Sequence, residues 1–148
     1  MNWTIKSAVA GALVTGLILS AYGKTEDLSA KTVARADGKA LYLMHCASCH
    51  GANLEGQPDW RRRKPDGRLP APPHDATGHT WHHPDDVLFK ITKLGTEAIV
   101  GGNYKSDMPG FAEVMTDDEI RATLDYIKST WPESISQRQQ RMNRRQQK

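Results

Sequence analysis

Two thiols and an imidazole lie within five consecutive residues of this chain, Cys46-Ala47-Ser48-Cys49-His50. Thiols three positions apart on one turn can add to the two vinyl groups along one edge of a porphyrin, and the next residue can then reach the iron. A cysteine pair followed directly by histidine is the attachment signal of c-type haem. The motif therefore predicts one covalent haem c bound by Cys46 and Cys49, with His50 as an axial ligand of the iron.

Three other uses of the two cysteines stay open at the level of the sequence. A thioredoxin-like dithiol would follow a strand of a βαβ unit, whereas the residues before Cys46 have a helical pattern. A surface disulfide could join Cys46 to Cys49. A zinc site would need further ligands, which four histidines could supply: His74, His79, His82 and His83. The chain has no other cysteine, so a disulfide scaffold is excluded.

A second iron ligand is predicted at Met108, within Ser106-Asp107-Met108-Pro109-Gly110-Phe111. The proline and glycine that follow Met108 place it in a loop. A soft thioether suits the low-spin iron of an electron carrier and raises its reduction potential. The alternatives for this sixth position are the histidines of residues 74–83, above all His79 and His82.

Helical apolar periodicity predicts the elements that must position these ligands. One helix spans 33–45 and leads into the cysteine motif. A second begins with Pro84 at its first helical position and ends at Gly95. A third follows a capping box that begins at Thr116, and it ends at Pro132. No strand alternation is present, so the fold class is all-α.

The connection between the motif and the second helix, residues 52–82, is long and polar. A connection of this length without regular structure usually has a function in a compact domain. Covering one edge of the haem would be such a function.

The two ends of the chain differ from the central part. Residues 1–23 contain one positive charge near the start, an apolar stretch and small residues before a polar segment. This is the pattern of a secretory signal peptide, with an uncleaved membrane anchor as the alternative. Residues 24–32 then form a linker, 33–132 the folded domain, and 133–148 a basic tail rich in Gln and Arg that either extends the last helix or is disordered.

The net charge of +3 is unevenly distributed along the chain. The last fifteen residues hold five basic residues and no acid, and Lys6 is the only charged residue before position 24. Residues 24–133 therefore hold 14 basic and 17 acidic residues. A nucleic-acid-binding module would concentrate basic charge on its folded part, so we expect no nucleic-acid partner. The one basic run, residues 61–64, is predicted to be a solvated loop.

With these motifs in place, residues from about 33 to 132 resemble a class I cytochrome c of the bacterial type. The resemblance depends on Gly38 and Tyr42 before the motif 46–51, on residues 108–111, and on a final helix that ends with 126–132. It implies three to five helices wrapped around one haem, with His50 on one side and Met108 on the other.

The resemblance also implies specific contacts around the haem. The first and last helices should cross at Gly38, with an aromatic residue such as Tyr126 packed there. A proline carbonyl, of Pro72 or Pro73, should accept a hydrogen bond from His50. The stretch from Gly51 to His83 is longer than in minimal members of the family, so the propionate contacts are less defined; the candidate donors are Trp81, Arg68 and Tyr104.

The function that follows is that of a one-electron carrier and not of an enzyme, because no substrate pocket or catalytic base is required. We expect it to be exported, and to be either periplasmic or attached to the inner membrane through its N-terminal segment. Its partners would be redox proteins. The alternatives are a haem-containing subunit of an oxidoreductase or peroxidase-like enzyme with an openable sixth position, and a haem-based sensor.

Overall fold

The structure is a computed structural model that describes residues 38–146. The predicted signal or anchor (1–23), the linker (24–32) and the start of the first helix lie outside the described residues. The chain divides into two units, Met1–Val33 and Ala34–Lys148, and the described residues all belong to the second. Among the described helices, none is both long and apolar enough to cross a membrane.

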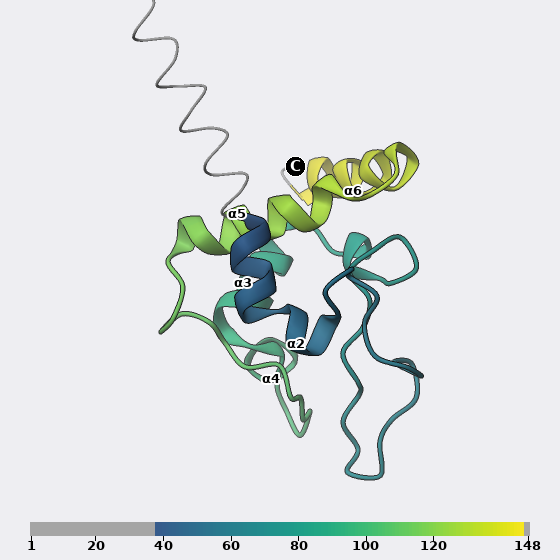
Figure 1. Ribbon diagram of the computed structural model, residues 1–148, viewed down its shortest axis with the longest axis vertical. Coiled ribbons are helices and arrows are strands. Elements are labelled where there is room, and N and C mark those ends of the chain that lie inside the picture. Colours follow the sequence, from purple (N-terminus) through teal and green to yellow (C-terminus); the bar gives the residue numbers. More distant parts are fainter. Residues whose placement is uncertain (1–37, 147–148) are drawn as a thin grey trace, which may run out of the picture. The chain divides into compact units, whose positions relative to one another are not determined.

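The described part of the chain is helical and contains no strand, which confirms the all-α prediction (Figure 1). Residues 38–45 form the end of the first helix. The elements that follow in order are α2 (Ala47–His50), the 3-10 helix η1 (Thr80–His82), α3 (Asp85–Leu94), α4 (Thr96–Val100), α5 (Asp117–Ser129) and α6 (Glu133–Gln146). The helices predicted before Gly95 and after Thr116 are thus present as α3 and α5.

The first helix crosses α5 at Gly38. A Cβ atom on Gly38 would overlap the carbonyl oxygen of Ala122 and lie 3.2 Å from Cβ of Tyr126. Only glycine therefore allows the two backbones to approach this closely. One turn further on, Tyr42 is fully buried, and its ring centroid lies 5.6 Å from that of Tyr126. The helix crossing and its aromatic contact agree with the family resemblance.

The signals that start and stop α3 and α5 act nearly where the sequence places them. Pro84, the predicted first helical residue, is instead the N-cap of α3, so the helix begins one position later at Asp85, and Gly95 ends it with φ of 86°. The capping box of Thr116 and Glu119 is complete at the start of α5. α5 ends at Ser129, three residues earlier than expected, yet Trp131 still reaches the core with only 6% of its surface exposed.

Residues Glu133–Gln146 of the basic tail form a separate helix, α6, which begins after α5 has ended at Ser129. The tail therefore neither continues α5 nor lacks regular structure over these residues. Gln139, 3% exposed, donates to Asp85 Oδ1 at 2.7 Å. Asn143 donates to Asp85 Oδ2 at 2.9 Å, and the Asp85 backbone N–H donates to Asn143 Oδ1 at 2.9 Å. These amide contacts join α6 to the first turn of α3. The four arginines of the described tail remain exposed: Arg138, Arg141, Arg144 and Arg145.

The long connection is irregular between Gly51 and His79, as predicted, but it is internally tied. Gln57 and Ala71 exchange two hydrogen bonds: the Gln57 backbone N–H donates to the Ala71 carbonyl at 2.8 Å, and the Ala71 N–H donates to Gln57 Oε1 at 3.0 Å. The basic run lies on this connection, and Arg61, Arg62 and Arg63 are exposed, as the prediction of a solvated loop requires.

The buried amide contact on α6 yields a prediction about stability. Gln139→Ala should lower the free energy of unfolding by about 1–2 kcal/mol, because it removes a buried hydrogen bond to a carboxylate. Gln140→Ala, at the exposed neighbouring position, is the matched control and should be close to neutral. Denaturant unfolding of the two variants makes the comparison, and equal midpoints would contradict the docking of α6 through Gln139.

Candidate haem-binding site

The two thiols and His50 lie on one turn, as attachment to a single porphyrin edge requires. Cys46 is the N-cap of α2, and its carbonyl accepts the backbone N–H groups of Cys49 at 3.1 Å and His50 at 2.9 Å. Both thiols are free; Cys49 is exposed and Cys46 is half-buried. The structure therefore contains no disulfide between them.

The Cys46 thiol has the wrong acidity for a thioredoxin-like redox pair. Burial, followed by the charge of Cys49, raises the pKa of Cys46 to about 11. Redox-active cysteines have a lowered pKa, because the thiolate is the reactive form. This direction of shift, and the absence of a strand from the described residues, disfavour the dithiol alternative.

His50 is oriented by a hydrogen bond to the long connection. Its Nδ1 lies 2.8 Å from the carbonyl oxygen of Pro72, so Pro72 and not Pro73 is the acceptor. A carbonyl oxygen can only accept, so the proton is on Nδ1 and the lone pair is on Nε2. His50 is 6% exposed, and burial lowers its pKa, with the Pro72 hydrogen bond acting in the opposite direction. The ring is thereby held neutral with Nε2 free to bind a metal.

The backbone around His50 is tied to neighbouring segments as well. The hydroxyl of Tyr42 donates to the Gly51 carbonyl at 2.8 Å, and the Gly56 N–H donates to the His50 carbonyl at 2.7 Å. The positive φ of Gly51 lets the chain turn away directly after the ligand. The histidine is consequently fixed through both its ring and its main chain.

A residue with an unexpected place at the site is His74, whose ring stacks on that of His50 with centroids 4.0 Å apart. His74 Nδ1 lies 2.8 Å from the hydroxyl of Thr80, and Trp131 Nε1 donates to the His74 carbonyl at 2.8 Å. Two stacked rings cannot supply ligands on opposite sides of one iron, since such nitrogens point at each other through the metal. No pattern of neighbouring residues predicts this stacking, because 24 positions separate the two histidines.

The remaining histidines do not form the predicted zinc alternative. In the part of the chain that the structure describes, no three His, Cys, Asp or Glu side chains come together as metal ligands. His82 is exposed, and its ring stacks on that of Trp81 with the centroids 3.7 Å apart. The His79 ring stacks on that of Trp60 with the centroids 5.3 Å apart.

The predicted second ligand, Met108, is half-buried in the loop that follows α4. The next residues close the end of α3: Phe111 N–H donates to Thr92 O at 3.0 Å, and Ala112 N–H donates to Lys93 O at 3.1 Å. The Phe111 ring lies 6.2 Å from that of His45, beside the cysteine motif. The loop placement of Met108 agrees with the sequence, and its role as an iron ligand stays a prediction.

The donors around this region fit a group that carries carboxylates, as haem does. Three buried side-chain nitrogens have no hydrogen-bond partner among the described residues: Trp81 Nε1, Arg68 Nε and His79 Nδ1. Buried polar atoms of this kind are costly unless they find a partner. Two of the three predicted propionate donors, Trp81 and Arg68, thus have a nitrogen available, although the Arg68 guanidinium also forms ion pairs with Asp66 and Asp107. The Tyr104 ring faces the guanidinium of Arg63 at 5.7 Å.

His79 and His83 form a pair whose protonation opposes folding. Their ring centroids are 5.4 Å apart. Burial is the largest cause that lowers the pKa of both. Neighbouring positive charge lowers the pKa of His79 further, from His83, His82 and Arg61, and His82 does the same for His83. In the unfolded chain these histidines titrate near their ordinary pKa of about 6.5.

The stability of the protein should therefore fall as the pH drops from about 7.5 to 5.5. Over this range the unfolded state binds more protons than the folded state, so the free energy of unfolding decreases on acidification. Replacing both histidines (His79→Gln with His83→Gln) should reduce this dependence and leave the part due to His74, whose pKa burial also lowers. Gln140→Ala, which removes no titratable group, should leave the dependence unchanged. Denaturant unfolding at several pH values measures the effect, and an unaltered slope in the double variant would contradict it.

Comparison with protein-family models matches residues 35–131 to the cytochrome c family. Comparisons with curated proteins and with solved structures gave no match. The matched residues include the cysteine motif, Met108 and all of α5, whereas α6 lies beyond them. The match confirms the resemblance and the helical fold class, and it implies one covalently bound haem c. Because the match spans more than half of the chain and includes Cys46, Cys49 and His50 on one turn, the chain belongs to the cytochrome c family of haem proteins.

Proposed function

We propose that this protein is an exported one-electron carrier whose haem iron is bound by His50 and Met108. The observation that carries the proposal is the hydrogen bond from His50 Nδ1 to the Pro72 carbonyl, which leaves Nε2 free on the same turn as two unpaired thiols. Bound haem supplies an iron that alternates between Fe(III) and Fe(II). The protein residues contribute the ligands, the burial and the hydrogen bonds that set its reduction potential.

The assignment of Met108 is supported by its surroundings. It lies in a loop fixed to the end of α3, and Phe111 extends from this loop toward the residue before Cys46. Its side chain is half-buried, as expected of a ligand in a partly enclosed site. By contrast, Met44 is 73% exposed and Met115 belongs to the apolar core.

The exposure of the two thiols supports transfer of electrons at the edge where they attach. Cys49 is exposed and Cys46 half-buried, so the haem edge that they hold would face solvent. Electron-transfer encounters typically use small interfaces and do not need a deep pocket. The partners would be donor and acceptor redox proteins that approach this edge.

The proposed location outside the cytoplasm depends on residues 1–23. Their short basic start, apolar stretch and small residues before a polar segment are typical of a secretory signal. If the segment is retained, the domain would be attached to the inner membrane by it; if it is cleaved, the domain would be periplasmic.

The ligand assignment is tested by the absorption spectrum of the oxidised haem protein. Met108→Ala should abolish the sulfur–iron charge-transfer band, because no other sulfur replaces the thioether, and it should lower the reduction potential. Met44→Ala is the matched control and should retain both properties, since Met44 is on the protein surface. Visible spectroscopy and potentiometric titration provide the measurements.

Two results would change this assignment. Covalent haem without the sulfur–iron band in the unaltered protein would favour an enzyme or sensor with an openable sixth position. A band that survives in Met108→Ala would show that a different sulfur binds the iron.

A further inference from the structure

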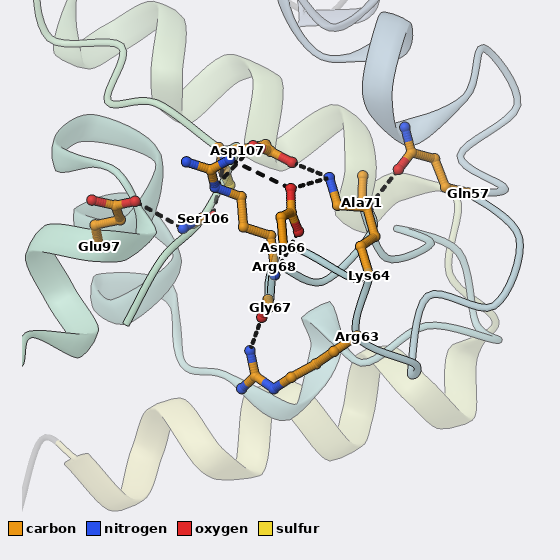
Figure 2. A network of polar contacts seen from close by, with 11 residues as sticks. Gln57, Arg63, Lys64, Asp66, Gly67, Arg68, Ala71, Glu97, Ser106 and Asp107 are labelled. Carbon is orange, nitrogen blue, oxygen red and sulfur yellow. Dashed lines mark hydrogen bonds and ion pairs between the residues drawn. The ribbon is translucent and has the colours of Figure 1, made fainter. Parts of the chain in front are cut away.

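Four charged side chains form a cluster between the long connection (residues 52–82) and Asp107, the residue directly before Met108 (Figure 2). Three of these side chains, Lys64, Asp66 and Arg68, come from the long connection. Asp107 comes from the methionine loop, which we define as residues 101–112 after α4. We propose that Lys64 and Arg68 are positioning residues that hold the methionine loop through Asp107 and thereby resist displacement of Met108 from the iron. This inference depends on the ligation of iron by Met108 proposed above.

Both oxygens of the Asp107 carboxylate are engaged. Lys64 Nζ lies 2.5 Å from Oδ2, and Arg68 Nε lies 3.3 Å from Oδ1. The Lys64 contact is a charge-assisted hydrogen bond, which is stronger than a neutral one, whereas the Arg68 contact is an ion pair without hydrogen-bond geometry. Two cations from the long connection therefore hold one carboxylate on the loop that carries the ligand.

The second carboxylate, Asp66, organises the two cations. It lies 3.8 Å from Lys64 Nζ and 3.5 Å from Arg68 Nη1, and its Oδ1 accepts the Arg68 backbone N–H at 3.0 Å. The Lys64 N–H donates to the Arg68 carbonyl at 2.8 Å. Lys64 and Arg68 are thus held side by side by their own turn, which reduces the entropy lost when they bind Asp107.

Met108 lies between this cluster and a separate set of anchors. On the far side, the Phe111 and Ala112 N–H groups bind the end of α3. On the near side, the Met108 N–H donates to Ser106 Oγ at 3.1 Å, and the Ser106 N–H donates to Glu97 Oε1 at 2.8 Å. These near-side contacts all come from residues close in sequence.

The charged cluster spans 43 positions between Lys64 and Asp107, so it links the methionine loop to the long connection. The other described contact between these segments, the Arg63 guanidinium over the Tyr104 ring at 5.7 Å, lies further from Met108 in the sequence. The same connection holds His50 through Pro72. The two predicted iron ligands are therefore secured by one segment, and loosening the cluster should affect Met108 while leaving His50 and the helices in place.

The cluster is suited to limiting the opening of one loop and not to stabilising the whole domain. Its side chains are 37–50% exposed, and ion pairs with this exposure add little to the stability of a whole domain. Opening of a single loop, however, involves few contacts, so the loss of one or two of them changes the open population measurably. The effect should also weaken at high salt, which screens such contacts.

The experiment uses the full-length haem protein and imidazole as a ligand that competes with Met108. Asp107→Asn and the double change Lys64→Gln with Arg68→Gln should each increase imidazole affinity roughly three- to tenfold, from the strength of exposed ion pairs. Loss of the sulfur–iron band reports binding. Added salt should raise the affinity of the unaltered protein and have less effect on Asp107→Asn.

The controls separate a local role from general changes in charge. Arg62→Gln removes an exposed cation from the same connection. It should retain the imidazole affinity of the unaltered protein. Adding Lys64→Gln and Arg68→Gln to Asp107→Asn should cause little further change, because the three residues act through one contact.

The outcomes distinguish this inference from the proposed function. If the band is present and Asp107→Asn leaves imidazole affinity unchanged, the positioning role is wrong and Met108 ligation stands. An equal rise in Arg62→Gln would likewise overturn it. Absence of the band from the unaltered protein would overturn both. Hydrogen exchange provides a second readout: the Met108 amide should exchange faster in Asp107→Asn than in Arg62→Gln.

Discussion

The hydrogen bond between His50 Nδ1 and the Pro72 carbonyl is the contact on which the rest of the site depends. It fixes which ring nitrogen carries the proton, and it therefore leaves the lone pair of Nε2 for the predicted bond to iron. It also joins the cysteine turn to the long connection, together with the hydrogen bond from the Gly56 N–H to the His50 carbonyl. His74, two residues after Pro72, then stacks on the same ring and limits its rotation.

The packing of the helices holds the segments that make this contact in place. The first helix can approach α5 closely only because Gly38 has no side chain, and Tyr42 fills the space one turn later. α3 ends where Gly95 adopts a positive φ, and the methionine loop caps its last carbonyls. The ends of the first helix and of α3 thus determine where the segments with the predicted ligands begin.

Two features add to the helices expected of a minimal member of the family. The long connection adds a charged cluster next to Met108, and α6 adds amide contacts to the first turn of α3. Both are polar attachments between segments that are distant in the sequence. Their partial exposure means that they adjust the local opening of loops and the position of a helix more than they stabilise the core.

Local signals in the sequence determined the cysteine motif, the loop position of Met108, the capping box of α5 and the end of α3, because each depends on residues a few positions apart. The sequence left Pro72 and Pro73 as alternatives and left the tail as a continuation of the last helix or as disorder. Only the tertiary structure decided these points. Each involves a contact between residues far apart in the chain: His50 with Pro72, and Gln139 with Asp85. The spacing of residues along the chain does not determine which of these distant groups meet.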